Sequence, residues 1–590
     1  MGALTDILNS ETYKKVEEEV ERFVKEKLDG YEPGKTIKKT IRDPVWGSIE
    51  FSVWEIQLID TPLLQRLRDV YQVGLVYFTY PASRHSRFEH SLGVFAAARK
   101  MCHSIKNNLR DIPVNDKDGK ENKNEEIKAI IKNIEEKENS IYLAALLHDV
   151  GHCFLSHLSE SIYGEFEDFR ELKKLFKDNL DRKTKPHEIL SFIIINTKTF
   201  KTFFSNRINY PDPIINHDVF FQNVGRMIVG DCIKEGNIKY SYLTSIINGP
   251  FDADKLDYIK RDSITTGLTL AYDVERLLNK IIVHNKSISN RNEYRLAIQF
   301  NGITAVEELT FCKIMLHSYL YYHQKVLTAD AMVKDYVQGL CRMGIINSYA
   351  DFLRYTDSDI FILGKGKNVD KFFNNHSLDL GDLADRIRNR RFPKRCFELS
   401  HTNVKNIRPE KPDNDLHLYC QKLIDKCKTD QITIEDVKKD IQIYTRKKTR
   451  KSHTLLDMLI KYLPELTYDD LLKKREELFY KLVERYESEG KPVDFSLFDI
   501  FIVFPKQVNY DMFKDEKVII GKDNTEFFTI DDFVKLDDWA SSFNSNKWRG
   551  YVFVSENIDR SIAFKVAQEY ILKGKAEIRN PTAYIRGISV

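Results

Sequence analysis

Apolar side chains recur at helical spacing along much of the first two thirds of the chain. The pattern is clearest in four segments, which are 62–74, 88–106, 140–149 and 302–340. Apolar residues three and four positions apart predict amphipathic helices, and the first segment starts with Pro62 and ends with Gly74, as helices often do. Residues 111–128 are polar and charged instead, which predicts an exposed loop. We therefore expect a mainly α-helical fold.

The pattern of apolar and polar residues changes from Val493 onward. Short apolar and aromatic runs such as FSLFDIFIVF and GYVFV alternate there with turn-forming residues, which predicts strands. We expect an N-terminal helical extension, a helical core, a helical and basic variable region, and a smaller C-terminal α+β region. The expected bounds of these four parts are 1–35, 36–400, 401–492 and 493–590.

The composition is that of a folded protein with a sizeable core. The chain has 590 residues, of which 42% are hydrophobic and 30% charged, so disorder throughout is excluded. Its 91 basic and 88 acidic residues leave a net charge of +3, which argues against a general polyanion binder. The 8 cysteines form no CxxC pair and are typical of reduced core residues. Without a signal-like start or a run of about 18 apolar residues, we expect a cytoplasmic protein with no membrane span.

One segment concentrates histidine and carboxylate side chains. The sequence LLHDVGHCFLSH contains His148, Asp149, His152 and His157, and the apolar run YLAALL leads into it. On a helix, His148 and His152 would share one face, and buried polar groups need partners, for which a cation is well suited. A His-Asp doublet alone is weak, because residues 217–218 form a second one. A divalent cation would need further ligands, for which the segments SRFEHSLG and DADKLDYIKRD are candidates.

Four segments together resemble one enzyme family. They are IDTPLLQRLRDVYQVG (59–74), YPASRHSRFEHSLGV (80–94), LLHDVGHCFLSH (146–157) and FDADKLDYIKRDS (251–263). In order and in spacing they are similar to the HD-domain superfamily of metal-dependent phosphohydrolases, and within it to the deoxynucleoside triphosphate (dNTP) triphosphohydrolases. The resemblance extends over residues 36–340. It implies an HD-domain helical core within residues 36–400.

The resemblance implies a divalent metal site. The family's ligands fall on His90, His148, Asp149 and Asp254 of this chain. Two imidazoles and two carboxylates suit manganese, magnesium or iron, and they suit zinc less well. We therefore expect a divalent metal cofactor of the first kind.

The resemblance also implies a reaction, in which a dNTP is hydrolysed to a deoxynucleoside and inorganic triphosphate. In the family, water attacks the α-phosphorus and an acid protonates the leaving 5′-oxygen. His187 corresponds to the proton donor, and Glu160 corresponds to its orienting partner, one methylene longer than the usual aspartate. His152 and His157 line the same pocket in the family and complete the implied catalytic group.

The implied substrate pocket draws on several segments. Its residues are Gln72, Val73, Arg87, Lys255, Tyr258, Asp262 and Tyr322. The arginine and the lysine would neutralise phosphates, while Gln72 and Asp262 would bond the 3′-hydroxyl beside Val73. Tyr258 would stack under the deoxyribose and leave no space for a 2′-hydroxyl. Core packing is the alternative explanation for this ring and for the other tyrosine.

The sequence departs from the family pattern at two places near this pocket. Phe154 stands where the family has a proline, and the family's base-contacting arginine falls near Ile314, with Lys313 beside it. The resemblance therefore implies no preferred base.

A second implied site would bind a nucleotide effector and assemble a homo-oligomer. Its residues are Lys39, Asp60, Gln65, Arg68, Arg390 and Lys394. Asp60 could instead cap the helix that starts at Pro62, and the two roles can coexist. Arg390 and Lys394 have i,i+4 spacing and would reach the effector of a neighbouring subunit. Arg42 replaces an asparagine that bridges two nucleotides in the family, so the effector can differ.

Two basic clusters, 386–395 and 446–451, leave alternatives open. A charge run is usually a solvated face, but either cluster could contact single-stranded nucleic acid or another subunit. One alternative function is that of an HD phosphohydrolase acting on a nucleoside monophosphate or a cyclic dinucleotide. Another is that of a non-catalytic nucleotide sensor or nucleic-acid-binding scaffold. Control of dNTP pools and antiviral defence against phage are both compatible with the family.

Overall fold

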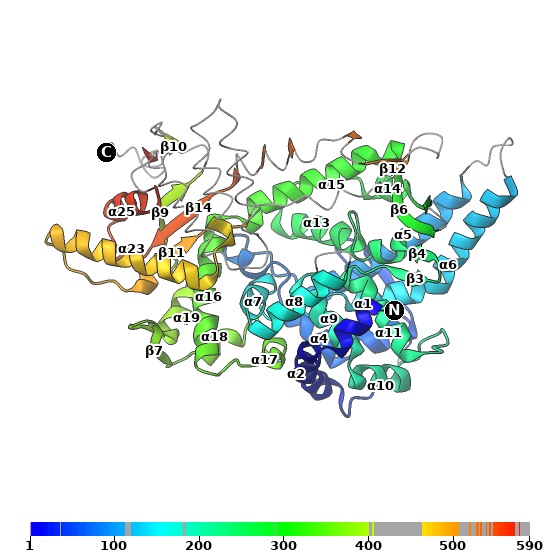
Figure 1. Cartoon of the computed structure of the whole chain (residues 1–590), viewed down its shortest axis with the longest axis horizontal. Coiled ribbons are helices and arrows are strands. Elements are labelled where there is room, and N and C mark those ends of the chain that lie inside the picture. The colour runs from blue at the N-terminus through cyan, green and yellow to red at the C-terminus, as the bar shows by residue number, and fades with distance from the viewer. Residues whose placement is uncertain are drawn as a thin grey trace. The chain divides into compact units, whose positions relative to one another are not determined.

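The computed structural model divides the chain into two compact units (Figure 1). The described residues are 2–35, 37–112, 120–180, 184–288, 291–400, 404–405, 463–506 and 547–572, with short stretches at 519–520, 527–529, 532–533, 538–539, 542–543 and 577–578. The first unit comprises Met1–Tyr321, Leu340–Lys365 and Tyr510–Leu536, and the second comprises Tyr322–Gly339, Gly366–Asn509 and Asp537–Val590. Each unit collects segments distant in sequence, so its limits follow contacts rather than chain order. The four expected parts stay a prediction.

The first unit is built mainly from helices. They are α1 (Gly2–Asn9), α2 (Glu11–Leu28), α3 (Val53–Ile59), α4 (Pro62–Gln65), α5 (Arg87–Arg110), α6 (Lys120–Leu147), α7 (His157–Tyr163), α8 (Glu167–Asn179), α9 (Pro186–Asn196), α10 (Lys198–Arg207), α11 (His217–Val229), α12 (Ser241–Ser245), α13 (Ala253–Thr266), α14 (Val274–Leu278), α15 (Ile303–Leu316), α17 (Tyr349–Arg354) and α18 (Ile360–Leu363). The 3-10 helices η1 (Arg66–Asp69), η2 (Gly74–Phe78) and η3 (Phe300–Gly302) and the π-helix η4 (His317–Tyr321) lie among them.

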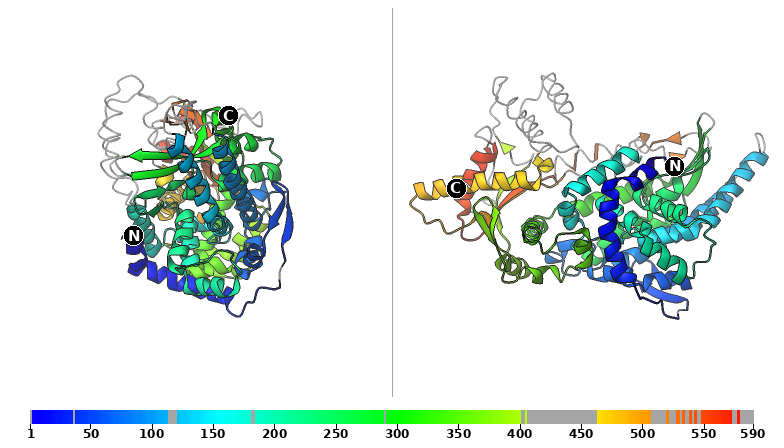
Figure 2. Two further views of the ribbon diagram at one scale, coloured as in Figure 1. Left: turned by 90° about the vertical axis from the view of Figure 1, so that its right-hand side faces the viewer. Right: turned by 60° about the horizontal axis from the view of Figure 1, so that its bottom comes forward.

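The long helices of this unit form a layered core. Helices α5 and α6 pack side by side, and α13 and α15 pack nearby (Figure 1). Helix α2 packs against α8, α9, α10 and α17, and the right view of Figure 2 shows it in dark blue along them. Its buried side chains Val16, Val20 and Phe23 recur three and four positions apart, which is the apolar stripe that such packing requires.

Strands of the first unit form a hairpin and a small sheet. The hairpin pairs β1 (Lys39–Asp43) with β2 (Gly47–Phe51) antiparallel. The sheet contains β3 (Ile233–Glu235), β4 (Ile238–Tyr240), β5 (Ile281–Ile288), β6 (Arg291–Gln299), β12 (Ile519–Ile520) and β13 (Phe527–Phe528). Its order is β13-β12-β6-β4-β3, and β5 also pairs antiparallel with β6. Because β12 joins from far along the chain, the sheet ties residues after 510 to the first unit.

The second unit combines helices and short strands. Its elements are α16 (Gln324–Arg342, shared at its end with the first unit), α19 (Leu380–Arg388), α23 (Tyr468–Ser488), α25 (Arg560–Leu572), η5 (Leu463–Glu465), η6 (Leu497–Asp499), β7 (Asn368–Phe373), β8 (His376–Asp379), β9 (Lys394–Leu399), β10 (Val404–Lys405), β11 (Ile500–Val503), β14 (Gly550–Val554) and β15 (Glu577–Ile578). A three-stranded antiparallel sheet has the order β11-β14-β9. Leu478, Leu482, Val552 and Val566 belong to the apolar core under it.

The mainly α-helical fold with a smaller α+β region is confirmed, and two local expectations are wrong. The helix expected over 62–74 ends at Gln65, because later backbone N–H groups bond to distant segments. The N–H of Tyr71 donates to Asp357, and that of Gln72 donates to the carbonyl of His85. The expected loop 111–128 is already helical from Lys120.

Ion pairs along α6 support its charged half. Lys128 pairs with Glu125 at 2.9 Å, and Lys132 pairs with Glu136 at 3.7 Å, at i,i+3 and i,i+4 spacing. Such pairs stabilise a solvated helix modestly. The polar sequence of this segment therefore predicted a loop where a charged helix begins. A bilayer crossing needs a long apolar helix, and the part of the chain that the structure describes contains none.

Candidate active site and metal centre

Helix α5 begins with a capping box that fixes two site residues. The backbone N–H of Ser86 donates to the Glu89 carboxylate at 2.5 Å, and the serine side chain caps the helix in return. This reciprocal arrangement satisfies free N–H groups at a helix start. It places Arg87 in the first turn and His90 in the next, with 3% and 0% of their surfaces exposed.

The His-Asp doublet follows a helix instead of lying on one. Helix α6 ends at Leu147, so His148 and His152 do not share a helix face as the sequence suggested. A Cβ at Gly151 would lie 2.3 Å from the backbone nitrogen of Ser191 on α9, so only glycine fits this close approach. The Ser191 hydroxyl accepts from Gly151 N–H at 2.8 Å and donates to the carbonyl of His148 at 2.7 Å. Contact with α9 therefore fixes the turn.

This turn brings the predicted metal ligands together. Ligand atoms of His90, His148 and Asp254 all lie within 4.8 Å of one another. The Nε2 atom of His90 lies 3.0 Å from Asp254 Oδ1 and 3.4 Å from His148 Nε2. Asp149 joins them, at 3.6 Å from His90 Nε2 and 3.4 Å from His148 Nε2. Two imidazole nitrogens and two carboxylates therefore converge, and this donor set fits a divalent cation.

The protein holds the second ring nitrogen of each histidine. The Nδ1 atom of His148 lies 2.8 Å from the carbonyl oxygen of Ala145, and the Nδ1 atom of His90 lies 2.7 Å from Asp257 Oδ2. With Nδ1 as the donor in both rings, each Nε2 presents a lone pair to the centre.

No role for Asp257 followed from the sequence, although this residue connects the group of predicted metal ligands to distant segments. Its carboxylate also accepts from Trp46 Nε1 at 2.7 Å and from Arg261 Nε at 2.8 Å, and Arg261 in turn donates to Asp43 at 2.9 Å. A Cβ at Gly93 would lie 1.9 Å from Asp257 Oδ1, so only glycine leaves room for this carboxylate. Its place one turn after the predicted ligand on α13 was the available signal.

The electrostatics of the group favour a positive charge at its middle. Burial by itself disfavours a charged ring, yet the carboxylates of Asp254 and Asp257 raise the pKa of His90 to about 9. Burial would raise the pKa of Asp149, but the Arg87 guanidinium holds that pKa well below its ordinary value. The carboxylates therefore stay ionised, which is the state that ligates a cation.

A second group lies beside the first and contains His152, His157, Glu160 and His187, with ligand atoms within 4.8 Å of one another. The Glu160 Oε1 atom lies 2.8 Å from Nδ1 of both His187 and His157. The rings of His152 and His187 stack with centroids 3.9 Å apart. Although burial would raise the pKa of Glu160, His187 and His157 hold it well below its ordinary value. The ionised carboxylate can orient a histidine, and the group could also hold a cation.

The predicted phosphate-binding cations are engaged within the protein. Arg87 donates through Nη1 to Asp149 at 2.7 Å and through Nε to Ser156 at 3.0 Å. Lys255 donates to Asp252 at 2.5 Å and to the carbonyl of Gly249 at 2.8 Å. An anionic ligand would compete with these two carboxylates for the cations.

Further lysines gather on the same side. Burial, followed by the ammonium groups of Lys255 and Lys185, lowers the pKa of Lys313 to about 7. Lys313 is the residue beside Ile314, where the family's base-contacting arginine falls. Lys313 is therefore near enough to both lysines for their charges to disfavour its ammonium form, while Asp252 and Asp254 oppose this effect.

The residues predicted to contact the sugar lie close together in part. The Nε2 atom of His85 lies 2.8 Å from Asp262 Oδ1, and the carbonyl of His85 accepts from the backbone N–H of Gln72 at 3.0 Å. The Gln72 side-chain oxygen is buried and has no hydrogen-bond partner among the described residues. Tyr258 and Val73 are half-buried. The structure thus joins the segments of Gln72 and Asp262 through His85.

Tyr321 contacts one of the residues predicted to bind the sugar, whereas the hydroxyl of Tyr322 bonds to another part of the chain. The Tyr321 hydroxyl donates to Asp262 Oδ2 at 2.5 Å. The Tyr322 hydroxyl donates to the carbonyl of Lys506 at 2.5 Å, within the second unit. The π-helix η4 explains the difference, because it adds one residue to a helical turn and shifts every following side chain.

The residues predicted for a regulatory site are exposed, apart from half-buried Gln65, and they are partly paired. Lys39 Nζ lies 3.1 Å from Asp60 Oδ2, and Arg68 Nε donates to Gln65 Oε1 at 2.7 Å. The alternative role of Asp60 as the N-cap of the helix that starts at Pro62 is wrong, and Asp60 is instead the C-cap residue of α3. Thr61 caps α4, and its side chain accepts a backbone N–H of that helix. The Asp60 carboxylate is therefore available to contacts other than a cap.

Arg390 and Lys394 belong to the second unit. Arg390 follows α19 with a φ of 57°, and Lys394 begins β9 and pairs with Glu556 at 2.6 Å. Their i,i+4 spacing therefore does not place them on one helix face. After burial, their charges lower the pKa of Lys325, so the three cations are neighbours. The basic run 446–451 lies outside the described residues.

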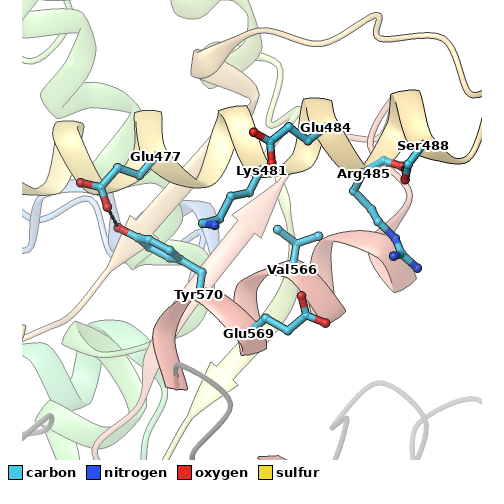
Figure 3. Close-up of a pocket in the computed structure, with 8 residues that line it drawn as sticks. All are labelled: Glu477, Lys481, Glu484, Arg485, Ser488, Val566, Glu569 and Tyr570. Carbon is cyan, nitrogen blue, oxygen red and sulfur yellow. Dashed lines mark hydrogen bonds between the residues drawn. The ribbon is translucent and has the colours of Figure 1, made fainter. Parts of the chain in front are cut away.

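A cavity of about 540 Å³ lies between α23 and α25 in the second unit (Figure 3). Its lining residues are Glu477, Lys481, Glu484, Arg485, Ser488, Val566, Glu569 and Tyr570. Tyr570 donates to Glu477 at 2.6 Å, and Arg485 donates to Glu489 at 2.9 Å. All of these lining residues belong to the second unit, whereas the residues of the metal group belong to the first.

A known family model matches the segment that contains most of the candidate site residues. The HD domain family model matches residues 87–214, from Arg87 to beyond His187. Residues 87–214 are thus similar to HD domains. Asp254 lies beyond them on α13, so the fourth predicted ligand comes from outside the matched stretch.

Curated proteins similar to this chain include viral and cellular proteins. An HD domain-containing protein of Acanthamoeba polyphaga mimivirus is 29% identical over 323 residues, which cover 54% of this chain and 62% of that protein. A deoxynucleoside triphosphate triphosphohydrolase of Bos taurus is 24% identical over 50% of this chain and 46% of its own. A homolog of that enzyme in Dictyostelium discoideum is 27% identical over 50% of this chain and 48% of its own. The chain thus spans 46% to 62% of the length of these relatives.

Solved structures share the fold at low identity. A protein from Aquifex aeolicus matches with a TM-score of 0.52 and 17% identity, over 90% of this chain and 100% of that one. A phosphohydrolase from Bacteroides thetaiotaomicron matches with a TM-score of 0.50 and 17% identity, over 88% of this chain and 100% of that one. At this identity the likeness shows the fold alone.

Proposed function

We propose that this chain is a metal-dependent hydrolase that converts dNTPs to deoxynucleosides and inorganic triphosphate. One observation carries the proposal. A set of two histidines and two carboxylates lies beside His187, and Glu160 holds the Nδ1 atom of His187 at 2.8 Å. A cation site next to an oriented proton donor is what hydrolysis of a phosphate ester requires. Two relatives with about half their length in common are named as triphosphohydrolases of this kind.

His90, His148, Asp149 and Asp254 would hold the cation. When bound, a divalent metal would polarise the α-phosphate and lower the pKa of a nearby water. Manganese, magnesium or iron suits this mixed nitrogen and oxygen set better than zinc does. Asp257 would keep His90 in the tautomer that presents Nε2, through its contact at 2.7 Å.

His187 would protonate the leaving 5′-oxygen. Its Nδ1 contacts ionised Glu160, so the proton to be transferred resides on Nε2, which lies 3.9 Å from Asp149 Oδ1 on the metal side. His152 stacks against this ring, and His157 shares the same carboxylate. These contacts fix the orientation of the donor, which is the property that a general acid needs.

Positively charged side chains would bind the triphosphate. Arg87 lies beside the ligand carboxylate of Asp149 and Lys255 beside the carboxylate of Asp252, and Lys313 has a pKa lowered to about 7 by burial and neighbouring lysines. A polyanion would relieve the repulsion among these cations. This compensation favours a triphosphate over a monophosphate or a cyclic dinucleotide.

The sugar would lie against Gln72, Val73 and Asp262. The unpartnered oxygen of buried Gln72 needs a donor, and a 3′-hydroxyl would supply one. Tyr258 would exclude a 2′-hydroxyl. Tyr321, through its bond to Asp262, is the better candidate than Tyr322 for the second tyrosine of this pocket.

The group of Lys39, Asp60, Gln65 and Arg68 would bind a nucleotide effector, with Arg390 and Lys394 supplied by a neighbouring subunit of a homo-oligomer. Asp60 can accept the hydrogen-bond donors of a guanine edge once it exchanges Lys39. Sigmoidal rates and an effector-dependent rise in mass by light scattering would accompany such activation. Control of dNTP pools or starvation of an invading phage would then be its cellular use.

A product assay tests the proposed reaction. Purified protein is incubated with Mn²⁺, Mg²⁺ or Fe²⁺ and with each dNTP, each NTP, nucleoside monophosphates and cyclic dinucleotides, and products are separated by ion-exchange chromatography. We expect deoxynucleoside and inorganic triphosphate in equal amounts from dNTPs. Release of pyrophosphate or orthophosphate, or hydrolysis of monophosphates or cyclic dinucleotides only, would replace the proposal by another HD phosphohydrolase activity. No turnover with any metal would favour a sensor.

A further inference from the structure

The backbone is strained where the active-site turn enters α7. Leu155 and Ser156 have φ angles of 55° and 51°, and Ser156 has a ψ of −122°. Residues with side chains rarely adopt such backbone angles, which are unfavourable unless the surroundings hold them. The strained pair lies directly before His157 and four residues before Glu160. Something in the fold must therefore hold this turn in place.

Asp357 supplies that constraint from a distant part of the first unit. It lies between α17 and α18, and 6% of its surface is exposed. Its Oδ1 accepts from the backbone N–H of Leu155 at 2.6 Å, and its Oδ2 accepts from the backbone N–H of Tyr71 at 2.9 Å. The backbone N–H of Asp357 donates to the carbonyl of Asp69 at 3.1 Å. One carboxylate thus joins the strained turn to the segment before Gln72.

The two joined segments also meet at Arg87. The Ser156 hydroxyl donates to the carbonyl of Tyr71 at 2.6 Å and accepts from Arg87 Nε at 3.0 Å. Arg87 Nη2 donates to the carbonyl of Gln72 at 3.1 Å, and Nη1 contacts Asp149. A shift of the strained turn would therefore displace both the guanidinium and the group that orients the proton donor.

We propose that Asp357 is a positioning residue, whose two carboxylate oxygens hold the Leu155–Ser156 turn against the Tyr71 segment and thereby set the geometry between Arg87 and the His187–Glu160 pair. The role rests on the proposed hydrolase function. The hydrogen bonds of Asp357 run to backbone groups of Leu155, Tyr71 and Asp69, so its contacts hold chain segments rather than catalytic side chains.

The charge of Asp357 matters because both of its partners are donors. Burial raises the pKa of Asp357 to about 7, although the N–H groups of Leu155 and Tyr71 and the charge of Arg87 oppose this. Asp69 and Tyr77 are the other titratable neighbours, and Asp69 adds to the rise. Above pH 7 the ionised carboxylate accepts from both segments. Below pH 7 a protonated oxygen faces an N–H donor and the connection weakens.

Asp357→Asn tests the proposal, because it keeps the shape and turns one acceptor into a donor. Asp359→Asn is the matched control, since Asp359 is exposed and caps its own loop by accepting from Thr356 N–H at 3.1 Å. We expect Asp357→Asn to lower kcat by about 10- to 100-fold with KM and metal content retained, since small misplacements cost this much. The rise of kcat through about pH 7 should disappear in this variant only.

Hydrogen exchange provides a readout that does not depend on turnover. Peptides that contain Tyr71 and Leu155 should exchange faster in Asp357→Asn than in the wild type or the control. If Asp357→Asn does not fold, Asp357→Glu replaces it, because it keeps the charge and displaces the oxygens by one methylene.

The outcomes separate the two proposals. A wild type without dNTP hydrolysis refutes the proposed function, while the exchange experiment still tests the constraint. An active wild type with equal kcat and equal exchange in Asp357→Asn and Asp359→Asn refutes the positioning role. A loss of metal or of the folded state in step with activity would also refute it, because Asp357 would then be a stability residue.

Discussion

The chain contains two His-Asp doublets, and only one of them lies in a site. His148 and Asp149 follow the apolar end of α6, and 3% of the Asp149 side chain is exposed. His217 and Asp218 begin α11 at the surface, where 72% of the Asp218 side chain is exposed and it pairs with Lys201 at 2.6 Å. The same two residue types therefore serve either a buried ligand set or a solvated helix start.

The difference shows what gives a doublet its chemistry. At the surface, water and Lys201 satisfy the carboxylate, and exposed ion pairs contribute little. In the interior, Asp149 meets His90 at 3.6 Å and Arg87 at 2.7 Å, because water cannot replace these partners. Burial before the doublet, rather than the doublet itself, is the feature that indicates a site.

Removing a ligand from the buried doublet gives the largest expected effect. His148→Ala or Asp149→Ala should abolish metal binding and hydrolysis together, because three ligands with an unbalanced charge remain. Elemental analysis and a triphosphate-release assay measure both quantities. His217→Ala and Asp218→Ala are the matched controls and should change neither. Full activity in a metal-free variant would contradict the HD assignment.

A substitution in the neighbouring His-Glu group should slow the chemical step without weakening the binding of substrate or metal. His187→Ala should lower kcat by about 10²- to 10⁴-fold, as loss of a general acid does, while metal content and KM stay near wild-type values. His103→Ala, an exposed histidine on α5, is the control. A raised KM at unchanged kcat would instead make His187 a binding residue.

Tyr258 should decide sugar selectivity. Tyr258→Ala should admit ribonucleotides and lower dNTP turnover, and it should reduce the dNTP-over-NTP preference by about 10- to 100-fold. Competing-substrate assays with dGTP and GTP measure the ratio. Tyr319→Ala, with 42% of its surface exposed in the wild type, serves as the control. A wild type that hydrolyses both equally would leave Tyr258 with a packing role.

The smallest expected effect is a pH dependence of substrate binding. Burial and neighbouring lysines lower the pKa of Lys313 to about 7, so its ammonium group is lost as the pH rises through 7. A triphosphate then meets one positive charge fewer, and KM should rise severalfold between about pH 6 and pH 8. Lys313→Gln should raise KM and flatten this profile. The exposed Lys198→Gln should leave it unchanged.

Several features could be predicted from the sequence because they depend on residues that are close together along the chain. Helical periodicity predicted α5 and the α15–α16 region, and the ordered motifs predicted that His90, His148, Asp149 and Asp254 would meet. The residue pattern after Val493 predicted the α+β region. The motifs succeeded across long separations because they were compared with a family, and not because periodicity reports on tertiary contacts.

Tertiary structure decided the features that depend on distant partners. Gly151 must pack against Ser191 on α9, and this contact ends α6 before His148. Asp257 contacts His90 across 167 positions, and Asp357 contacts Leu155 across 202. No local pattern encodes such bonds, because which buried donor meets which acceptor is settled only when the helices pack. The sequence by itself therefore predicted which side chains gather at the candidate site, and only the packed fold decided what holds them in place.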